Sequence, residues 1–595
     1  MRLYDGSSTC TAAICLLALP LVGCGADPAR ELQPGVDGPA ITARMVPDFP
    51  ETWRWEPGRE ATFAPEAMIT SDSRVAAEAG LEILRQGGNA VDAAVATGFA
   101  LAVTYPLAGN IGGGGFMVIR LADGTTAALD YRETAPLAAT PRMYLDESGE
   151  KVHSSEVGHL AVAVPGSVAG LAATQERFGR LELADVIAPA IRLAEEGFEV
   201  DTMLSMGLGR FAPVLTRFGG AGIFYDDGAP VRPGTRLVQP ELARTLRTIA
   251  AEGPDSFYRG ELADLIVAEM ERGDGLISHE DLAAYRPVWR DPIEAEYRGF
   301  PVLAMPLASS GGVAMIEALN ILATYDSLPD FHGANYKHLL AEALRRAFID
   351  RNTELCDPAF CDPPIERLTS EEYARELRRT IDPERATPSP PPPDLIGGIH
   401  TTHYSVVDGE GNAVATTTTL NGPGGSGVVV GGAGFFLNNE MDDFATSAGP
   451  NMFRLLEGAQ NRVEPGKRPL SSMSPTIVHD PAGEVLLVMG GAGGPMILTG
   501  TLQMILNVVD HRMSWTDAMH APRLHHQAWP DSLMYETGGL HASARDSLTA
   551  MGHALLEQPG LMNVNGIMRV EDGWHGLTQP LPPGIPAQDA GAVGY

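Results

Sequence analysis

A proline-rich stretch at residues 388–393, Pro-Ser-Pro-Pro-Pro-Pro, constrains the fold of this 595-residue chain more than any other feature. Consecutive prolines lack amide donors and cannot lie inside a helix or a central strand, so the stretch is an extended connector. Before it, from residue 181 to about 374, the apolar pattern is mostly helical, whereas strand-like sequence begins soon after it. We therefore place the clearest boundary of the chain at this connector.

The sequence that follows the connector predicts a β-hairpin with threonines on both arms. Residues 401–408, Thr-Thr-His-Tyr-Ser-Val-Val-Asp, form the first arm, and residues 413–420, Ala-Val-Ala-Thr-Thr-Thr-Thr-Leu, form the second after a turn at Gly411-Asn412. β-Branched residues bounded by Gly and Asn are typical of such a hairpin. A further strand at 484–489 and a helical stretch at 504–509 make the C-terminal third a mixed α/β unit.

The N-terminal part predicts helices and strands as well. Apolar residues at three- and four-residue spacing indicate two packed helices at 75–84 and 91–96, separated by Gly87-Gly88-Asn89. A run of four glycines at 112–115 then leads into a strand, and residues 126–132 predict a second strand.

The first residues indicate export. An apolar stretch from Ala12 to Val22 is too short to span a bilayer as a helix, which favours a cleaved signal at residues 1–23. The stretch ends in Leu-Val-Gly-Cys and looks like a bacterial lipobox, so we expect Cys24 to be lipidated and residues 24–60 to form a tether. The alternative is a plain secretory signal with a chance cysteine. No later segment has 18 uninterrupted apolar residues.

Cysteine content and charge limit the remaining function classes. After Cys24 only Cys356 and Cys361 remain, and in an oxidising compartment they suit a local disulfide better than a zinc site. The formal net charge is 42 − 75 = −33, which repels phosphate backbones, so we expect no nucleic-acid partner.

The sequence lacks the complete form of several common catalytic and cofactor-binding motifs. We therefore expect no cofactor and no metal. The glycines at 112–115 lack the Gly-Lys-Ser/Thr ending of a phosphate loop, and no Gly-x-Ser-x-Gly elbow is present. His279-Glu280 is not followed by a second histidine, because position 283 is alanine. The histidines at 520, 525 and 526 suit structural hydrogen bonds better than a metal site.

One ordered series of motifs closely resembles the gamma-glutamyltransferases. Its members, from the N-terminus, are Gly109–Phe116, Asp130-Tyr131-Arg132-Glu133, Ser309-Ser310-Gly311-Gly312, Thr401–Tyr404, Thr419-Leu420-Asn421, Asn438–Phe444, Lys467–Thr476 and Gly490–Gly494. The resemblance covers roughly residues 70–527 in register.

The resemblance implies an N-terminal-nucleophile fold of the α/β (α+β) class, in which two β-sheets stack between helical layers as αββα. It also implies a precursor that cleaves itself between His400 and Thr401 into a large subunit (61–400) and a small subunit (401–595), which stay together as a heterodimer. The Thr401 hydroxyl attacks the preceding carbonyl, and water releases the resulting ester. The freed α-amine, with an ordinary pKa of roughly 7.7–8.0, then serves as general base for its own hydroxyl.

Catalytic roles follow from the same resemblance. Thr401 would form the γ-glutamyl ester, and Thr419 would hydrogen-bond Thr401 and hold it in line. The backbone N–H groups of Gly493 and Gly494 would bind the oxyanion, where the lack of a Cβ allows close approach.

Substrate roles divide between the two ionic groups of an amino acid. Arg132 would hold the α-carboxylate with a bidentate guanidinium. Ser471 and Ser472 would donate hydroxyl hydrogen bonds to the same carboxylate. The α-ammonium would be surrounded by three further side chains, namely Asn421, Glu440 and Asp443. A departure from many members of the family is Pro495-Met496, which stands where they carry a hydroxyl and a basic or polar residue.

The resulting hypothesis is an exported hydrolase/transferase of glutathione and related γ-glutamyl amides, with water, amino acids or peptides as acceptors. We expect it at the periplasmic face or in the cell envelope, held to the membrane by its lipid anchor only. Two alternatives stay open: a glutaryl or cephalosporin-type acylase of the same fold, and a non-catalytic lipoprotein that binds amino-acid-like ligands. The acidic Asp443 favours donors with an α-amine over glutaryl donors.

Mass spectrometry of the purified protein tests the cleavage. The wild type is expected to yield a 195-residue fragment (595 − 400) that begins at Thr401, because only a free threonine amine completes the nucleophile. The Thr401→Ala variant is expected to stay one chain. An active wild type with an intact bond before Thr401 would contradict the mechanism.

Overall fold

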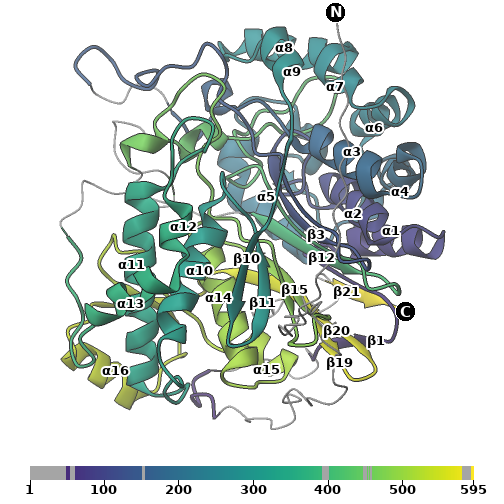
Figure 1. The fold of residues 1–595 in the computed structure, drawn as a ribbon. Helices are drawn as coiled ribbons and strands as arrows, with labels where there is room; N and C mark the ends of the chain where they lie inside the picture. Colours follow the sequence, from purple (N-terminus) through teal and green to yellow (C-terminus); the bar gives the residue numbers. More distant parts are fainter. Residues whose placement is uncertain are drawn as a thin grey trace, which may run out of the picture. The chain divides into compact units, whose positions relative to one another are not determined.

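The computed structural model describes residues 48–53, 60–149, 154–390, 401–445, 452, 455, 458–578 and 591–595. All of them lie within Ala43–Tyr595, which forms one compact unit. Its centre consists of two antiparallel seven-stranded sheets that stack face to face (Figure 1).

Sheet 1 contains the predicted threonine hairpin at its centre. Its strand order is β21 (Gly591–Gly594), β2 (Met68–Ser71), β12 (Thr402–Val407), β13 (Ala413–Thr419), β3 (Gly114–Arg120), β4 (Thr126–Asp130) and β9 (Val288–Arg290). Sheet 2 has the order β1 (Thr62–Ala64), β20 (Gly573–Thr578), β19 (Asn563–Val570), β15 (Val485–Ala492), β14 (Thr476–His479), β11 (Phe300–Ala304) and β10 (Ile293–Tyr297).

Helices cover the outer face of each sheet. Sheet 1 packs against α1 (Arg74–Arg85), α2 (Ala90–Thr104) and α3 (Ser167–Phe178). Sheet 2 packs against α10 (Ser310–Ala323), α14 (Met496–Val509) and α15 (Trp515–His520), and α11 (Ala334–Glu354) packs on α10. The layers are therefore αββα, as the resemblance implied.

The remaining elements surround these layers. The helices are α4 (Leu183–Glu196), α5 (Thr202–Leu215), α6 (Pro240–Glu252), α7 (Asp255–Arg259), α8 (Glu261–Arg272), α9 (His279–Ala284), α12 (Ile365–Leu368), α13 (Glu371–Arg379) and α16 (Ala542–Ala550). Short strands are β5 (Phe198–Glu199), β6 (Tyr225–Asp226), β7 (Ala229–Pro230), β8 (Arg236–Leu237), β16 (Leu524–His525), β17 (Leu533–Glu536) and β18 (Leu555–Gln558). Single 3₁₀ turns occur at His159–Ala161, Ala221–Phe224, Glu440–Asp443 and Ala459–Asn461.

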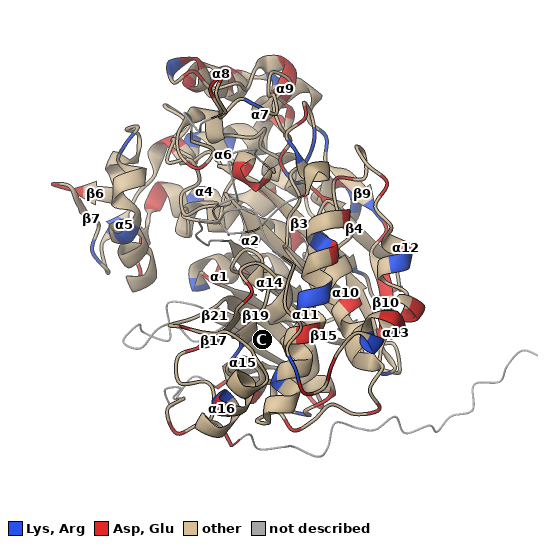
Figure 2. Cartoon of the chain, turned by 90° about the vertical axis from the view of Figure 1, so that its left-hand side faces the viewer, with Lys and Arg blue, Asp and Glu red and all other residues tan. Residues whose placement is uncertain are grey.

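All residues of β12 and β13 are buried, because helices cover one face of sheet 1 and sheet 2 covers the other. Successive side chains of a strand point to opposite faces. Tyr404 and Val406 of β12 accordingly pack with the helices on sheet 1, and Val407 packs with Ile567 and other residues between the sheets. Charged residues occur on helices outside the sheets, among them α8, α11 and α16, and on the connecting segments (Figure 2).

Local sequence signals located α1, α2 and the hairpin of β12 and β13 correctly. The break at 87–89 separates α1 from α2, and Asn89 caps α2 by accepting from the amides of Val91 and Asp92, both at 3.0 Å. The stretch from 181 to 374 is mostly helical as expected, but it also contributes β9, β10 and β11, which the helical pattern concealed. These strands are only three to five residues long. β9 and β10 are the edge strands of their sheets, and β9 and β11 pair with β4 and β14, which are distant in the sequence.

Further expectations concern the termini and the cysteines. Cys356 and Cys361 form the expected disulfide. The C-terminal strand β21 pairs with β2 at the edge of sheet 1. Residues 1–23, Cys24 and most of the 24–60 tether lie outside the described residues, so these boundaries remain predictions, as does the division at 400/401. In the part of the chain that the structure describes, no helix has the length and apolarity needed to cross a membrane.

Candidate active site

Thr401 lies immediately before β12, at the centre of sheet 1. The register of the hairpin places Thr402 opposite Thr418, so the residues just beyond this pair, Thr401 and Thr419, meet at the open end of the two strands. Their hydroxyl oxygens are 3.4 Å apart, and both side chains are buried. The Thr419 hydroxyl also accepts from the amide of Asn421 at 2.8 Å. Thr419 is thus fixed beside the predicted nucleophile.

A cavity with about 310 Å³ of empty volume opens at this point. Nine of the residues singled out in the sequence line it, namely Arg132, Thr401, Thr419, Asn421, Glu440, Asp443, Ser471, Ser472 and Gly494. These residues come from six separate segments of the chain. The cavity is also lined by residues for which no role was predicted: Arg351, Leu455, Leu470, Met473, Pro495 and Ile497.

A buried group of charges occupies one wall of the cavity. The guanidinium of Arg132, which follows β4, donates to the carboxylates of Glu440 and Asp443, both held by one 3₁₀ turn. Its Nε donates to the carbonyl of Pro469 at 3.2 Å. Arg132 is 1 % exposed, so these contacts act at low dielectric and are much stronger than a surface pair. The predicted cation and the predicted anions therefore hold one another in place.

Glu133 is fully buried next to Arg132 and adds a third carboxylate to this charged group, although it does not line the cavity. One of its oxygens lies 3.8 Å from Nη1 of Arg132, and neither oxygen has a hydrogen-bond partner. Burial raises the pKa of Glu133 to about 7, and burial likewise raises the pKa of Glu440 well above its ordinary value. One arginine cannot stabilise three ionised acids, so part of the group holds protons near neutral pH.

The serine pair forms another wall. Ser471 and the Ser309-Ser310 turn are joined by backbone bonds: the amide of Ser310 donates to the Ser471 carbonyl at 2.8 Å, and the amide of Ser471 donates to the carbonyl of Ala308 at 3.0 Å. The two serine motifs of the sequence, 161 residues apart, are thus one structural unit.

The glycine pair connects β15 to α14. Gly493 and Gly494 have φ of 139° and 58°, and residues with side chains rarely adopt these conformations. Gly494 lines the cavity at the N-terminal end of α14, where the helix dipole favours negative charge. Gly493 is adjacent but is not among the lining residues.

Asp72 binds the residue that follows the predicted nucleophile Thr401, and it was not singled out in the sequence. Its carboxylate accepts from the Thr402 hydroxyl at 2.8 Å and from the side-chain amide of Asn563 at 2.7 Å. Burial raises its pKa. Because Asp72 follows β2 and Asn563 begins β19, this carboxylate ties the start of β12 to both sheets. No sequence motif marks it, since its partners are 330 and 491 residues away.

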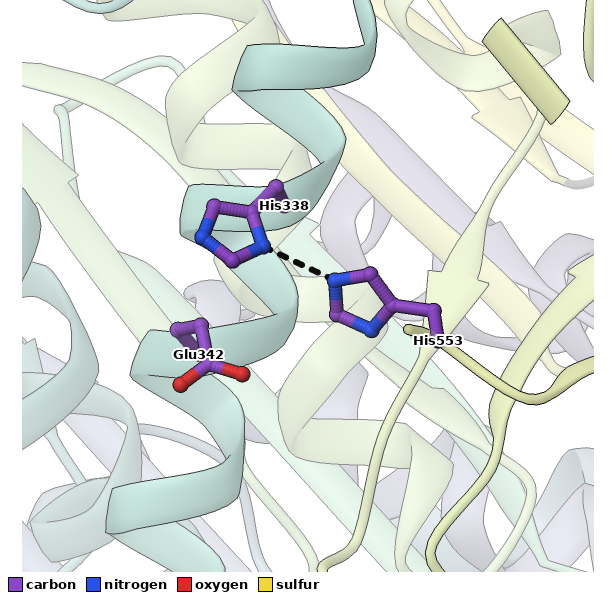
Figure 3. Close-up of side chains that lie close together, drawn as sticks. All are labelled: His338, Glu342 and His553. Carbon is purple, nitrogen blue, oxygen red and sulfur yellow. Dashed lines mark hydrogen bonds between the residues drawn. The ribbon is translucent and has the colours of Figure 1, made fainter. Parts of the chain in front are cut away.

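One group of side chains has the spacing of a metal site within the described part of the chain: His338, Glu342 and His553 (Figure 3). His338 Nε2 donates to a backbone carbonyl, so in the neutral ring Nδ1 accepts from Nε2 of His553 at 2.8 Å. Glu342 is bonded to Arg345 at 3.2 Å and Arg346 at 2.8 Å. Two guanidiniums repel a dication, so this group is better explained as a hydrogen-bonded link between α11 and the segment after α16.

Of the three histidines considered in the sequence, His525 bonds the Thr499 hydroxyl at 3.0 Å through Nδ1 and the side chain of Gln527 at 2.8 Å through Nε2. Of the predicted site residues, His400 and Cys24 lie outside the described residues.

Comparison with known proteins agrees with this geometry. The gamma-glutamyltranspeptidase family model matches residues 76–588. The chain is 45 % identical to a glutathione hydrolase proenzyme of Pseudomonas sp. (strain A14), over 82 % of this chain and 86 % of that protein. It is 44 % identical to a glutathione hydrolase proenzyme of Escherichia coli (strain K12), over 87 % and 90 %. Among solved structures, a cephalosporin acylase from Bacillus halodurans superposes with a TM-score of 0.80 at 29 % identity, covering 92 % of this chain and 99 % of that one.

Glu133 generates a pH-dependent prediction. Its folded pKa of about 7 lies above the ordinary 4.5, so between these values the folded protein holds a proton that the unfolded chain has lost. Its contribution to stability therefore falls as the pH rises through this window. We compare the Thr401→Ala precursor with the same precursor carrying Glu133→Gln. The free energy of unfolding of the second chain, relative to that of the first, is expected to rise by up to about 3 kcal/mol between pH 5 and pH 8. Denaturant unfolding of both chains measures this, and loss of the repulsion between Glu133 and Glu440 in the variant acts in the same direction. A difference independent of pH would contradict it.

Proposed function

The chain belongs to the gamma-glutamyltranspeptidase family, and on this premise we propose that it is a self-cleaving γ-glutamyl hydrolase and transferase. It removes the γ-glutamyl group from glutathione and related amides. The observation that carries the proposal is the cavity itself, in which a buried threonine pair opens onto one wall of opposite charges and one wall of serines.

Recognition of the donor uses both of its ionic groups. An α-amino acid head carries a carboxylate and an ammonium group that are both bonded to the same carbon. Arg132 with Ser471 and Ser472 offers donors for the carboxylate, and Asp443, Glu440 and Asn421 offer acceptors for the ammonium. In the structure Arg132 contacts the two acids. The incoming zwitterion exchanges these contacts for its own, so no charge is left buried without a partner.

Acyl transfer then proceeds at Thr401. Its Oγ attacks the γ-carbonyl carbon, and its hydroxyl proton passes to its own α-amine. The carbonyl oxygen becomes an oxyanion that the amides of Gly493 and Gly494 stabilise. When the C–N bond breaks, the α-ammonium returns the proton to the leaving amine, and the γ-glutamyl ester of Thr401 remains. Water, or the amine of an amino acid or peptide, attacks this ester and restores the free hydroxyl.

The protein is made as one precursor that yields a large and a small subunit, as the name proenzyme indicates for its relatives. We place the division between His400 and Thr401. Both sheets contain strands from both sides of this bond. In sheet 1, β12 and β13 lie between β2 and β3, and in sheet 2, β14, β15, β19 and β20 lie between β1 and β11. Backbone hydrogen bonds therefore hold the two subunits together after cleavage.

The acylase alternative is a related branch of the same fold, represented by the B. halodurans structure. Two buried acids at the ammonium position argue against it, because a glutaryl group has no ammonium to pair with them.

Paired anilide donors test this assignment. The wild type is expected to cleave γ-glutamyl-p-nitroanilide in preference to glutaryl-p-nitroanilide. Asp443→Asn keeps the shape but removes one charge, and breaking a buried charge pair costs about 2–5 kcal/mol, so kcat/KM for the γ-glutamyl donor is expected to fall by about 30- to 5000-fold. The glutaryl donor serves as the internal control and is expected to lose little. A wild type that prefers the glutaryl donor would favour the acylase.

For the cellular location, the Leu-Val-Gly-Cys sequence supports an envelope protein anchored by a lipid on Cys24 and facing the periplasm. Membrane fractionation tests this part of the proposal. The wild type is expected in the membrane fraction, whereas Cys24→Ser is expected among the soluble exported proteins, since it removes the acylated thiol. Equal distribution of the two would instead indicate a plain secretory signal.

A further inference from the structure

Arg351 approaches the cavity from the helical layer on sheet 2, far from Arg132 in the sequence. It lies in the last turn of α11, is 1 % exposed and lines the same cavity as Thr401. Its Nε donates to the hydroxyl of Ser310 at 3.1 Å, and its Nη2 donates to the hydroxyl of Ser472 at 3.4 Å. One guanidinium thus contacts both serine motifs.

These contacts determine the direction in which the serine hydroxyls donate. A serine hydroxyl has one proton and two lone pairs, whereas a guanidinium is only a donor. Ser310 accepts from Arg351 and donates its own proton to the carbonyl of Ser471. Ser472 likewise accepts from Arg351, so its proton points elsewhere. Because Ser472 lines the cavity, a carboxylate placed there is a ready acceptor.

Charge supports the same arrangement. Arg132 shares its charge with Glu440 and Asp443, the acids suited to the substrate ammonium. Hydrogen bonds to Ser310, Ser472 and Asn352, the last from Nη1 at 3.0 Å, help to compensate the buried Arg351 guanidinium for its lost hydration. A donor α-carboxylate bound at the serine pair lies beside this positive charge.

We propose that Arg351 is a positioning residue for the donor α-carboxylate: it orients the Ser472 hydroxyl toward this group and adds a second positive charge on the serine side of the cavity. The inference rests on the proposed function, since it concerns the same donor. Within that function it assigns selectivity for α-carboxylates jointly to Arg132 and Arg351, which come from opposite layers of the fold.

Two donors that differ only in the α-carboxylate provide the test: γ-glutamyl-p-nitroanilide and 4-aminobutanoyl-p-nitroanilide. A hydrogen bond to a charged group contributes about 1.5–3 kcal/mol, so Arg351→Ala is expected to lower kcat/KM for the γ-glutamyl donor by about 10- to 150-fold, mainly through KM. The 4-aminobutanoyl donor is expected to be nearly unaffected. Arg351→Lys is expected to recover part of the loss, since it keeps the charge but not the fork that reaches both serines.

A double-mutant cycle with Ser472→Ala separates positioning from general support. If Arg351 acts through Ser472, its replacement is expected to cost much less in the Ser472→Ala background than in the wild type. Arg346→Ala is the matched control, because Arg346 is a buried arginine of the same helix that bonds Glu342 instead of the cavity serines. Any loss it causes is expected to fall equally on both donors.

Mass spectrometry and the thermal midpoint establish that each variant is cleaved and folded. Should Arg351→Ala fail to mature, Arg351→Lys and Ser472→Ala carry the comparison. Equal losses on both donors, or additive effects of Arg351 and Ser472, would overturn the inference while leaving the proposed function intact. Failure of the wild type to turn over the γ-glutamyl donor would instead defeat the proposed function.

Discussion

The pairing of β12 with β13 at the centre of sheet 1 is the constraint on which the rest of the site depends. Its register brings the hydroxyls of Thr401 and Thr419 to 3.4 Å at the end of the hairpin, and the buried carboxylate of Asp72 holds the adjacent Thr402. Because β12 is covered by a helical layer on one face and by sheet 2 on the other, its first residue has little freedom to move. A nucleophile in this place gains its precision from the backbone ladder rather than from a flexible loop.

The electrostatics of the cavity follow from this rigid frame. Arg132, Glu440 and Asp443 are buried together, where each charge is costly alone and favourable only in combination. A zwitterionic amino-acid head fits such a set, since it replaces each internal contact by an equivalent one. A substrate with only one of the two charges leaves a buried group without its partner, so selectivity arises from the penalty on the wrong substrate as much as from attraction to the right one.

The interleaved topology explains how one chain can be cut and still act as one enzyme. Each main sheet contains strands from before and after residue 400, and the wall of serines joins Ser310 to Ser471 across the same division. The cavity is completed only by residues from both parts, with Arg132 and Arg351 on one side of the division and Thr401, Asp443 and Ser472 on the other. Cleavage at the proposed position before Thr401 would change the chemistry of that residue without separating the groups that surround it.

The sequence by itself determined the helices α1 and α2, the threonine hairpin and nine of the residues that line the cavity, because these depend on local periodicity, turn residues and short motifs. Only the tertiary structure decided that β9, β10 and β11 complete the sheets, that Asp72 holds the start of β12, and that Arg351 reaches Ser472. The physical reason is the same in each case. A three-residue edge strand, a lone aspartate or an arginine near the end of a charged helix has no local pattern that distinguishes it, and its role is defined by partners more than a hundred residues away, which only folding brings into contact.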